Sequence, residues 1–89
     1  MAKGYWVVRV DVTDAEEFKA YQAFVGPFLQ TYGGRFVVRG GRQTLTEGTA
    51  RQRTVVVEFA SYEAALAAYD SAEYRKGINP REQSAIADF

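Results

Sequence analysis

Three segments of the chain carry the alternating pattern of half-buried β-strands, and their spacing is what most restricts the fold. They are residues 4–12, 35–39 and 53–59, which read GYWVVRVDV, RFVVR and RTVVVEF. A helix fits after the first and third segments, whereas only a polar connection lies between the second and third. The order strand, helix, strand, strand, helix predicts an α+β sandwich whose helices cover one face of an antiparallel sheet. Because 89 residues suffice for one domain only, residues 1–89 are expected to fold as a unit.

The first helix is predicted from a capping box, in which Thr13 is the N-cap and Glu16 stands three residues later. Gly26-Pro27 lies inside the helical stripe and is expected to kink or break the last turns. The apolar residues of the stripe are Phe18, Tyr21, Val25, Phe28, Leu29 and Tyr32.

The second helix is predicted to begin after Ser61, which caps it. Ser71 and Asn79-Pro80 predict two further short helical segments. A split βαβ arrangement requires a fourth strand after these helices, and residues 87–89 resemble only its beginning. The sequence therefore predicts a truncated last strand, or a sheet edge that a partner completes. The stripe expected to be buried on the second helix is Tyr62, Ala65, Leu66 and Tyr69.

The residue types that are missing exclude several kinds of active site. The chain has no cysteine and no histidine, which excludes disulfides, thiol nucleophiles, a Ser-His-Asp triad and histidine-bound zinc or haem. No calcium-loop spacing of acidic residues is present, so we expect neither a metal nor a cofactor. Eleven basic and eleven acidic residues argue against nucleic-acid binding. No apolar run is long enough to span a membrane and no signal-peptide pattern opens the chain, so we expect a cytoplasmic protein.

One face of the predicted sheet mixes charged and apolar side chains. A solvated face with cross-strand ion pairs is one interpretation of this mixture. Its valines and tyrosine favour a second interpretation, in which another copy of the chain covers the face and encloses a pocket, so we expect a homodimer. The residues assigned to this face are Tyr5, Val7, Arg9, Asp11, Arg35, Val37, Arg39, Thr54, Val56 and Glu58.

Arg39 and Glu58 are the predicted catalytic pair of such a pocket. Arg39 would orient a carboxylate or enolate through two parallel hydrogen bonds. Glu58, if desolvated, would have a raised pKa and act as a general base. The candidate ligand-binding residues are Tyr5, Arg9 and Asp11 on the same face, with Tyr69 and Tyr74 near the end of the second helix.

Four segments follow one another in an order that is typical of one protein family: GYWVVRVDVTD, YGGRFVVRGG, RTVVVEF and SYEAALAAYDSAEY. On these segments the chain resembles the bacterial domain-of-unknown-function family thirteen-thirty, within the dimeric α/β-barrel (ferredoxin-like) superfamily. The resemblance implies that the sheets of two protomers face each other around a cavity, and it implies a final strand that this sequence lacks. It brings no established activity. The family pattern falls on Arg39, Arg53, Glu58, Tyr74 and Arg81, which adds Arg53 to the candidate ligand-binding residues.

Three functions compete at this point. The first is a cofactor-independent isomerase- or monooxygenase-like enzyme acting on a small metabolite, and its sign would be a pocket of about 300 Å³ with Glu58 desolvated inside it. The second is a non-catalytic small-ligand-binding or stress-related module. The third, binding of single-stranded nucleic acid on the open sheet, requires aromatic residues where this sequence places Thr54, Val56 and Glu58.

Overall fold

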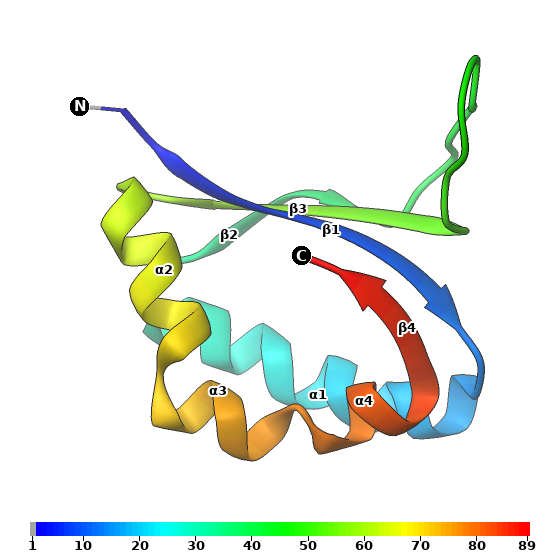
Figure 1. Cartoon of the computed structure of the whole chain (residues 1–89). Helices are drawn as coiled ribbons and strands as arrows, with labels where there is room; N and C mark the ends of the chain where they lie inside the picture. Colours follow the sequence, from blue (N-terminus) through cyan, green and yellow to red (C-terminus); the bar gives the residue numbers. More distant parts are fainter. Residues whose placement is uncertain (1) are drawn as a thin grey trace.

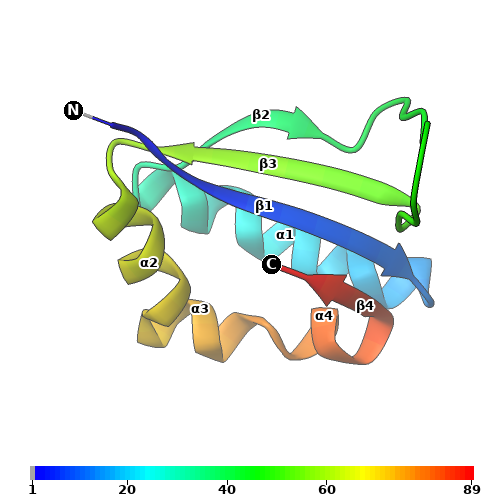
Figure 2. The same cartoon turned by 45° about the horizontal axis from the view of Figure 1, so that its top comes forward.

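An antiparallel sheet, open on one face, is covered on its other face by all the helices (Figure 1, Figure 2). The structure is a computed structural model that describes residues 2–89. The strands, in the spatial order β2-β3-β1-β4, are β1 (Gly4–Val12), β2 (Arg35–Arg39), β3 (Arg53–Phe59) and β4 (Ala85–Asp88). The helices are α1 (Ala15–Thr31), α2 (Tyr62–Asp70), α3 (Ala72–Gly77) and α4 (Asn79–Ser84). This arrangement confirms the predicted α+β, ferredoxin-like sandwich.

The alternation of β1 decides which side chains enter the core. Trp6, Val8 and Val10 are buried beneath the helices, whereas Tyr5 and Val7 point out of the open face. The indole of Trp6 donates a hydrogen bond of 2.8 Å from Nε1 to the carbonyl oxygen of Ala65. Its ring also lies 5.2 Å from the rings of both Phe59 and Tyr74, measured between centroids. Trp6 therefore connects β1, one of the two central strands, to α2 and α3.

Helix α1 differs from its prediction at both ends. Asp14, not Thr13, is the N-cap, and its carboxylate accepts a hydrogen bond of 3.2 Å from the backbone N–H of Glu17. Pro27 does not break the helix, which continues to Thr31. Leu29 and Phe28, both buried directly after the proline, hold this turn against the core, and that packing outweighs the hydrogen bond that proline cannot donate.

Helix α2 buries alanines where larger side chains were expected. Ser61 caps it as predicted, accepting a hydrogen bond of 3.0 Å from the N–H of Ala64. The predicted burial of Tyr62 and Leu66 is wrong, because these side chains are 64% and 48% exposed. The start of β1 crosses α2 so closely that a Cβ atom on Gly4 would collide with the backbone of Ser61. Gly4 therefore permits the close crossing, and the residues that α2 buries are Ala65 and Ala68.

A short last strand is present, which corrects the expectation that the sequence lacks one. Residues Ala85–Asp88 pair antiparallel with Arg9–Val12 of β1. Arg51 fastens the pair, because its Nε donates to Asp88 at 2.8 Å and its Nη1 donates to Asp11 at 2.9 Å. In Figure 2, β4 lies along only the C-terminal half of β1, and the chain ends near the middle of β1.

A one-residue bulge in β2 changes which face its second arginine occupies. Phe36 lies opposite Val57 on β3, yet Val38 lies opposite Val56 and Arg39 opposite Val55. The extra residue, Val37, delays the alternation by one position, so the residues after it change faces. Arg39 therefore lies on the helix side of the sheet, and its predicted position on the open face is wrong.

Candidate ligand-binding site

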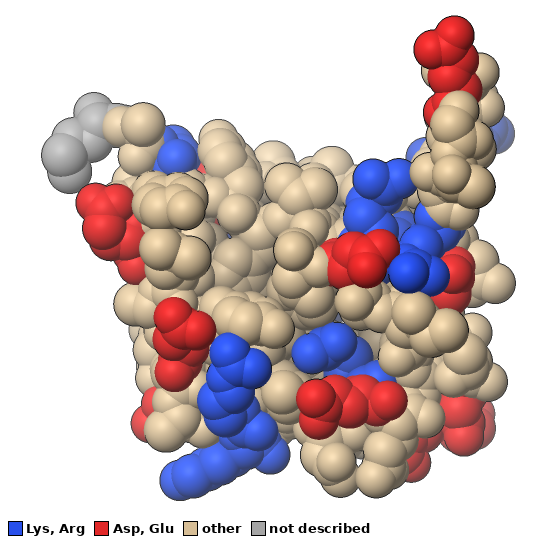
Figure 3. All heavy atoms as spheres, viewed as in Figure 1, with Lys and Arg blue, Asp and Glu red and all other residues tan. Residues whose placement is uncertain are grey.

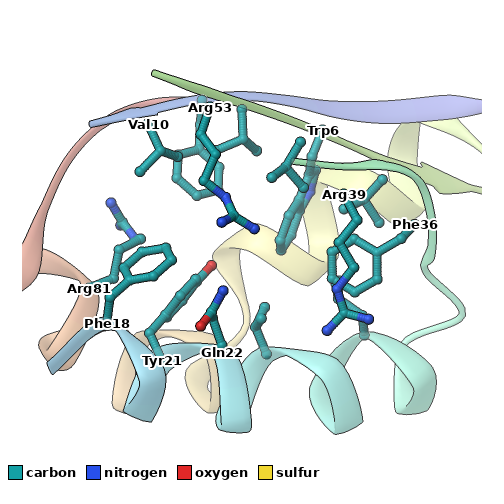
Figure 4. A pocket seen from close by; sticks show the side chains of 15 residues that line it. Trp6, Val10, Phe18, Tyr21, Gln22, Phe36, Arg39, Arg53 and Arg81 are labelled. Carbon is teal, nitrogen blue, oxygen red and sulfur yellow. The ribbon is translucent and has the colours of Figure 1, made fainter. Parts of the chain in front are cut away.

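A cavity of about 50 Å³ lies between the sheet and α1 (Figure 4). Most of its walls are aromatic and aliphatic side chains of the core, among them Trp6, Val25 and Leu29. Polar groups enter it from separate elements of the fold. They are Tyr21 and Gln22 from α1, Arg39 from β2, Arg53 from β3 and Arg81 from α4.

Arg53 enters the cavity from the first position of β3, and glycine makes room for it. A Cβ atom on Gly40 would lie 2.7 Å from Cζ of Arg53, and Gly40 also has a φ of +67°. The backbone conformation therefore favours glycine at position 40, and any side chain there would displace the guanidinium of Arg53. The Nε atom of Arg53 is buried and has no hydrogen-bond partner among the residues described.

Arg81 enters from the opposite side, on a short helix that is held firmly in place. The backbone N–H groups of Thr13 and Asp14 both donate to the carbonyl oxygen of Ser84, at 2.7 and 3.1 Å, and so join the end of α4 to the start of α1. Arg81 is only 8% exposed, and its guanidinium lies 4.7 Å from the centroid of the Phe89 ring. Its Nε atom, like that of Arg53, is buried and has no partner within residues 2–89.

Arg39 stands at the mouth of the cavity. Its side chain is exposed to solvent, and its guanidinium stacks 4.2 Å from the centroid of the Phe36 ring. Figure 4 shows the guanidinium of Arg39 extending from β2 down toward α1, whereas that of Arg53 lies above Tyr21 and Gln22. The three arginines thus line one space whose other walls, apart from Tyr21 and Gln22, are apolar.

Two tyrosines form a buried pair beside the arginines. The hydroxyls of Tyr21 and Tyr74 are 2.8 Å apart, and Tyr74 is fully buried. Burial raises the pKa of Tyr21 far above its ordinary value, and the neighbouring Tyr74 raises it further. Burial also raises the pKa of Tyr74. Both phenols are therefore neutral at physiological pH and serve as hydrogen-bonding groups.

The predicted pairing of Arg39 with Glu58 is wrong, because the two residues lie on opposite faces of the sheet. Glu58 instead accepts hydrogen bonds from Arg35 at 3.2 Å and from the hydroxyl of Tyr5 at 3.3 Å, and Lys3 lies 3.7 Å away. The hydrogen bond from Arg35 is the main cause that lowers the pKa of Glu58, where a raised pKa was expected. A catalytic role of either residue stays a prediction.

The other predicted ligand-binding residues are dispersed. Arg9 lies opposite Thr54 on the open face. Asp11 accepts a hydrogen bond from the backbone N–H of Gln52 and another from Arg51, and these lower its pKa. Near the foot of the loop that joins β2 and β3, Figure 3 shows basic and acidic atoms side by side. Tyr69 lines a separate groove between β1 and α2.

Of the predicted site residues, then, only Arg39 and Arg53 line the cavity. Gln22 was missed, although the sequence carries a signal for it. It follows Tyr21 and precedes Val25 by three positions, so it is a polar residue on an otherwise apolar helical stripe. Arg81 was implied only by the family resemblance, because its burial depends on how α4 docks against α1.

A family model described as a domain of unknown function (DUF1330) matches residues 3–89. The chain belongs to the DUF1330 family. Among solved structures, this DUF1330 chain is similar to RPA0582, a protein of unknown function from Rhodopseudomonas palustris, with a TM-score of 0.75 and 18% identity over 97% of this chain and 78% of that chain. The methylated form of RPA0582 gives a TM-score of 0.65 and 17% identity over 98% and 79% of the two chains. These likenesses support the fold alone.

The comparison with curated proteins found no match to this DUF1330 chain. Within residues 2–89, the acidic side chains nowhere gather in a group of three or more that could hold a metal ion. None of the helices described combines the length and the apolar character needed to cross a membrane.

Replacing Gly40 by alanine should both strain the backbone and displace Arg53. The positive φ alone costs about 1–2 kcal/mol for a residue with a Cβ atom, and the contact with the guanidinium adds to it. Urea unfolding followed by circular dichroism measures the loss. Gly48→Ala, with a φ of +85° but no neighbour within 4 Å, isolates the backbone strain, and Gly41→Ala, with neither feature, should be nearly neutral. Equal effects at positions 40 and 41 would contradict this account.

The buried tyrosines predict a loss of stability at alkaline pH. Above the ordinary tyrosine pKa of 10.0, the unfolded chain loses protons from Tyr21 and Tyr74 that the folded chain keeps, so the free energy of unfolding falls as pH rises. Tyr21→Phe removes one such group and should make the decline above pH 10 shallower, although it costs about 1 kcal/mol at neutral pH. Urea unfolding at several values between pH 7 and pH 11 tests this. Parallel curves for the two proteins would refute it.

Proposed function

We propose that the chain is a small-ligand-binding protein whose ligand occupies the cavity between the sheet and α1. The observation that carries this proposal is the pair of buried, unpartnered Nε atoms on Arg53 and Arg81. Folded proteins pair the great majority of their buried polar groups, since an unpaired one costs about 1–3 kcal/mol. A ligand that accepts hydrogen bonds inside the cavity would give both groups partners.

The lining of the cavity favours binding over catalysis. Among the residues described, those that line it include no carboxylate that could act as a general base. The phenols of Tyr21 and Tyr74 hold their protons, because burial raises the pKa of both. An isomerase- or monooxygenase-like reaction has less support here, since the predicted base, Glu58, lies on the other face of the sheet in an ion pair with Arg35.

We further propose that two copies of the chain associate through the open face of the sheet. Val38, Val56 and Val7 lie side by side across β2, β3 and β1 on this face, and Val7 is 53% exposed. Tyr5, 50% exposed, continues the apolar surface along β1. Apolar side chains in a row on an uncovered sheet are suited to packing against a second sheet.

A thermal-shift screen of compact metabolites tests the ligand-binding proposal. At least one compound should raise the melting temperature of the wild-type protein, because a ligand that binds only the folded state stabilises it. Val25→Leu adds a methylene to the cavity wall and should abolish most of that shift. Val37→Leu makes the same change on an exposed side chain outside the cavity and should leave the shift intact. A panel that yields no stabilising compound would count against the proposal.

Light scattering of the purified protein tests the proposed dimer. The expected mass is twice the 10.0 kDa of one chain. Val7→Glu should give a folded monomer, because a buried, unpaired carboxylate at the centre of the interface is costly. Ala20→Glu introduces the same charge at an exposed position of α1, which covers the other face of the sheet, and should leave the dimer unchanged. A wild-type protein with the mass of one chain would rule the dimer out.

A further inference from the structure

We infer that the ligand of this cavity is a short-chain monocarboxylate whose carboxylate is held by Arg53 and Arg81. The inference rests on the proposed ligand-binding function and adds the chemical class of the ligand. It starts from a contrast between the arginines of this chain. Three arginines outside the cavity have acidic partners: Arg35 pairs with Glu58, Arg51 with Asp11 and Asp88, and Arg75 with Asp70. Arg9 and the exposed Arg42 have none among the residues described, but their charges lie in contact with solvent.

The arginines inside the cavity have no such partners. None of the ion pairs within residues 2–89 includes Arg53 or Arg81. Arginine keeps its proton in proteins, so both side chains bring a full positive charge into an apolar space. A buried charge without a counter-charge is far more costly than an exposed one. Because the Nε atoms of both side chains are buried without a partner among the residues described, an anion bound between the two guanidiniums would supply the missing acceptor and counter-charge.

The shapes of the groups favour a carboxylate over other anions. A guanidinium is a planar fork that matches the two oxygens of a carboxylate. The guanidinium of Arg53 lies beside the backbone of Gly40, and that of Arg81 lies over the Phe89 ring, so both already have neighbours in the cavity wall. Gln22 adds an amide from α1, which lies below Arg53 in Figure 4.

The volume of the cavity and the chemistry of its walls restrict the rest of the ligand. A single water needs about 10–15 Å³ of such a cavity, so the roughly 50 Å³ present here suit about three to five non-hydrogen atoms. Apart from the arginines and Gln22, the neighbouring walls are apolar side chains such as Trp6, Val25 and Leu29. A carboxylate with one or two attached carbons, such as acetate or propionate, fills this volume with its charge at the arginines and its carbons against the core.

NMR of the arginine Nε–H groups tests this inference directly, using propionate as the probe. Titration should shift the resonances of Arg53 and Arg81, which single Arg→Lys variants assign. Propionamide has the same shape without the charge and should bind at least tenfold more weakly. Arg53→Gln should weaken propionate binding at least tenfold, whereas the matched change Arg75→Gln, at an exposed ion pair, should leave it unchanged. Because Gly40→Ala displaces Arg53 but keeps its charge, it serves as a second variant should Arg53→Gln fail to fold.

The outcomes separate this inference from the proposed function. If propionamide binds as tightly as propionate and Val25→Leu weakens both, the claim that the ligand is an anion is overturned. The ligand-binding function would still stand. Inorganic phosphate shifting both resonances while propionate does not would overturn the carboxylate in favour of a compact inorganic anion. If neither anion shifts either resonance, the inference fails. Only an additional absence of any stabilising compound in the thermal-shift screen would count against the function itself.

Discussion

The packing around Trp6 is the interaction on which the other elements depend. Its indole sits under the middle of the sheet, bonded to the backbone of α2 at Ala65 and surrounded by the rings of Phe59, Tyr69, Tyr74 and Phe89. These rings belong to β3, α2, α3 and the end of the chain, so one side chain holds elements that are distant in sequence. A buried aromatic cluster of this kind contributes both apolar area and ring geometry. In a domain this small, few alternative cores are available.

The cavity lies beside this aromatic packing and shares Trp6 and Phe89 with it. Its remaining walls combine further rings with the shorter side chains of Val8, Val10 and Val25 and with the side chains of the arginines. Arg81 reaches this space because α4 is bonded through Ser84 to the start of α1. The site is thus assembled from four elements, and no two of its polar residues on different elements are close in sequence.

That assembly explains what the sequence could and could not predict. Strands, helices and the buried face of β1 follow from local periodicity, which the chain displays clearly in residues 4–12 and 53–59. The face of the sheet on which Arg39 lies does not follow from periodicity. Nothing in the run RFVVR marks the bulge at Val37, and strict alternation therefore predicted the open face instead of the helix-covered face. The partners of Glu58 likewise depend on register between strands, which put Arg35 beside it. Burial of Arg81 depends on tertiary docking alone.

Gly40 carries a consequence for how sequences of this kind can vary. Two independent features disfavour a side chain at this position. The backbone has a positive φ, and the guanidinium of Arg53 occupies the space that a side chain would fill. The neighbouring Gly41 has neither feature, so other residues can replace it. A chain that keeps an arginine at position 53 but replaces the glycine at 40 must therefore carry that charge elsewhere. Adjacent glycines that read alike in the sequence thus differ in the substitutions they tolerate, and the first of them reports on the shape of the cavity.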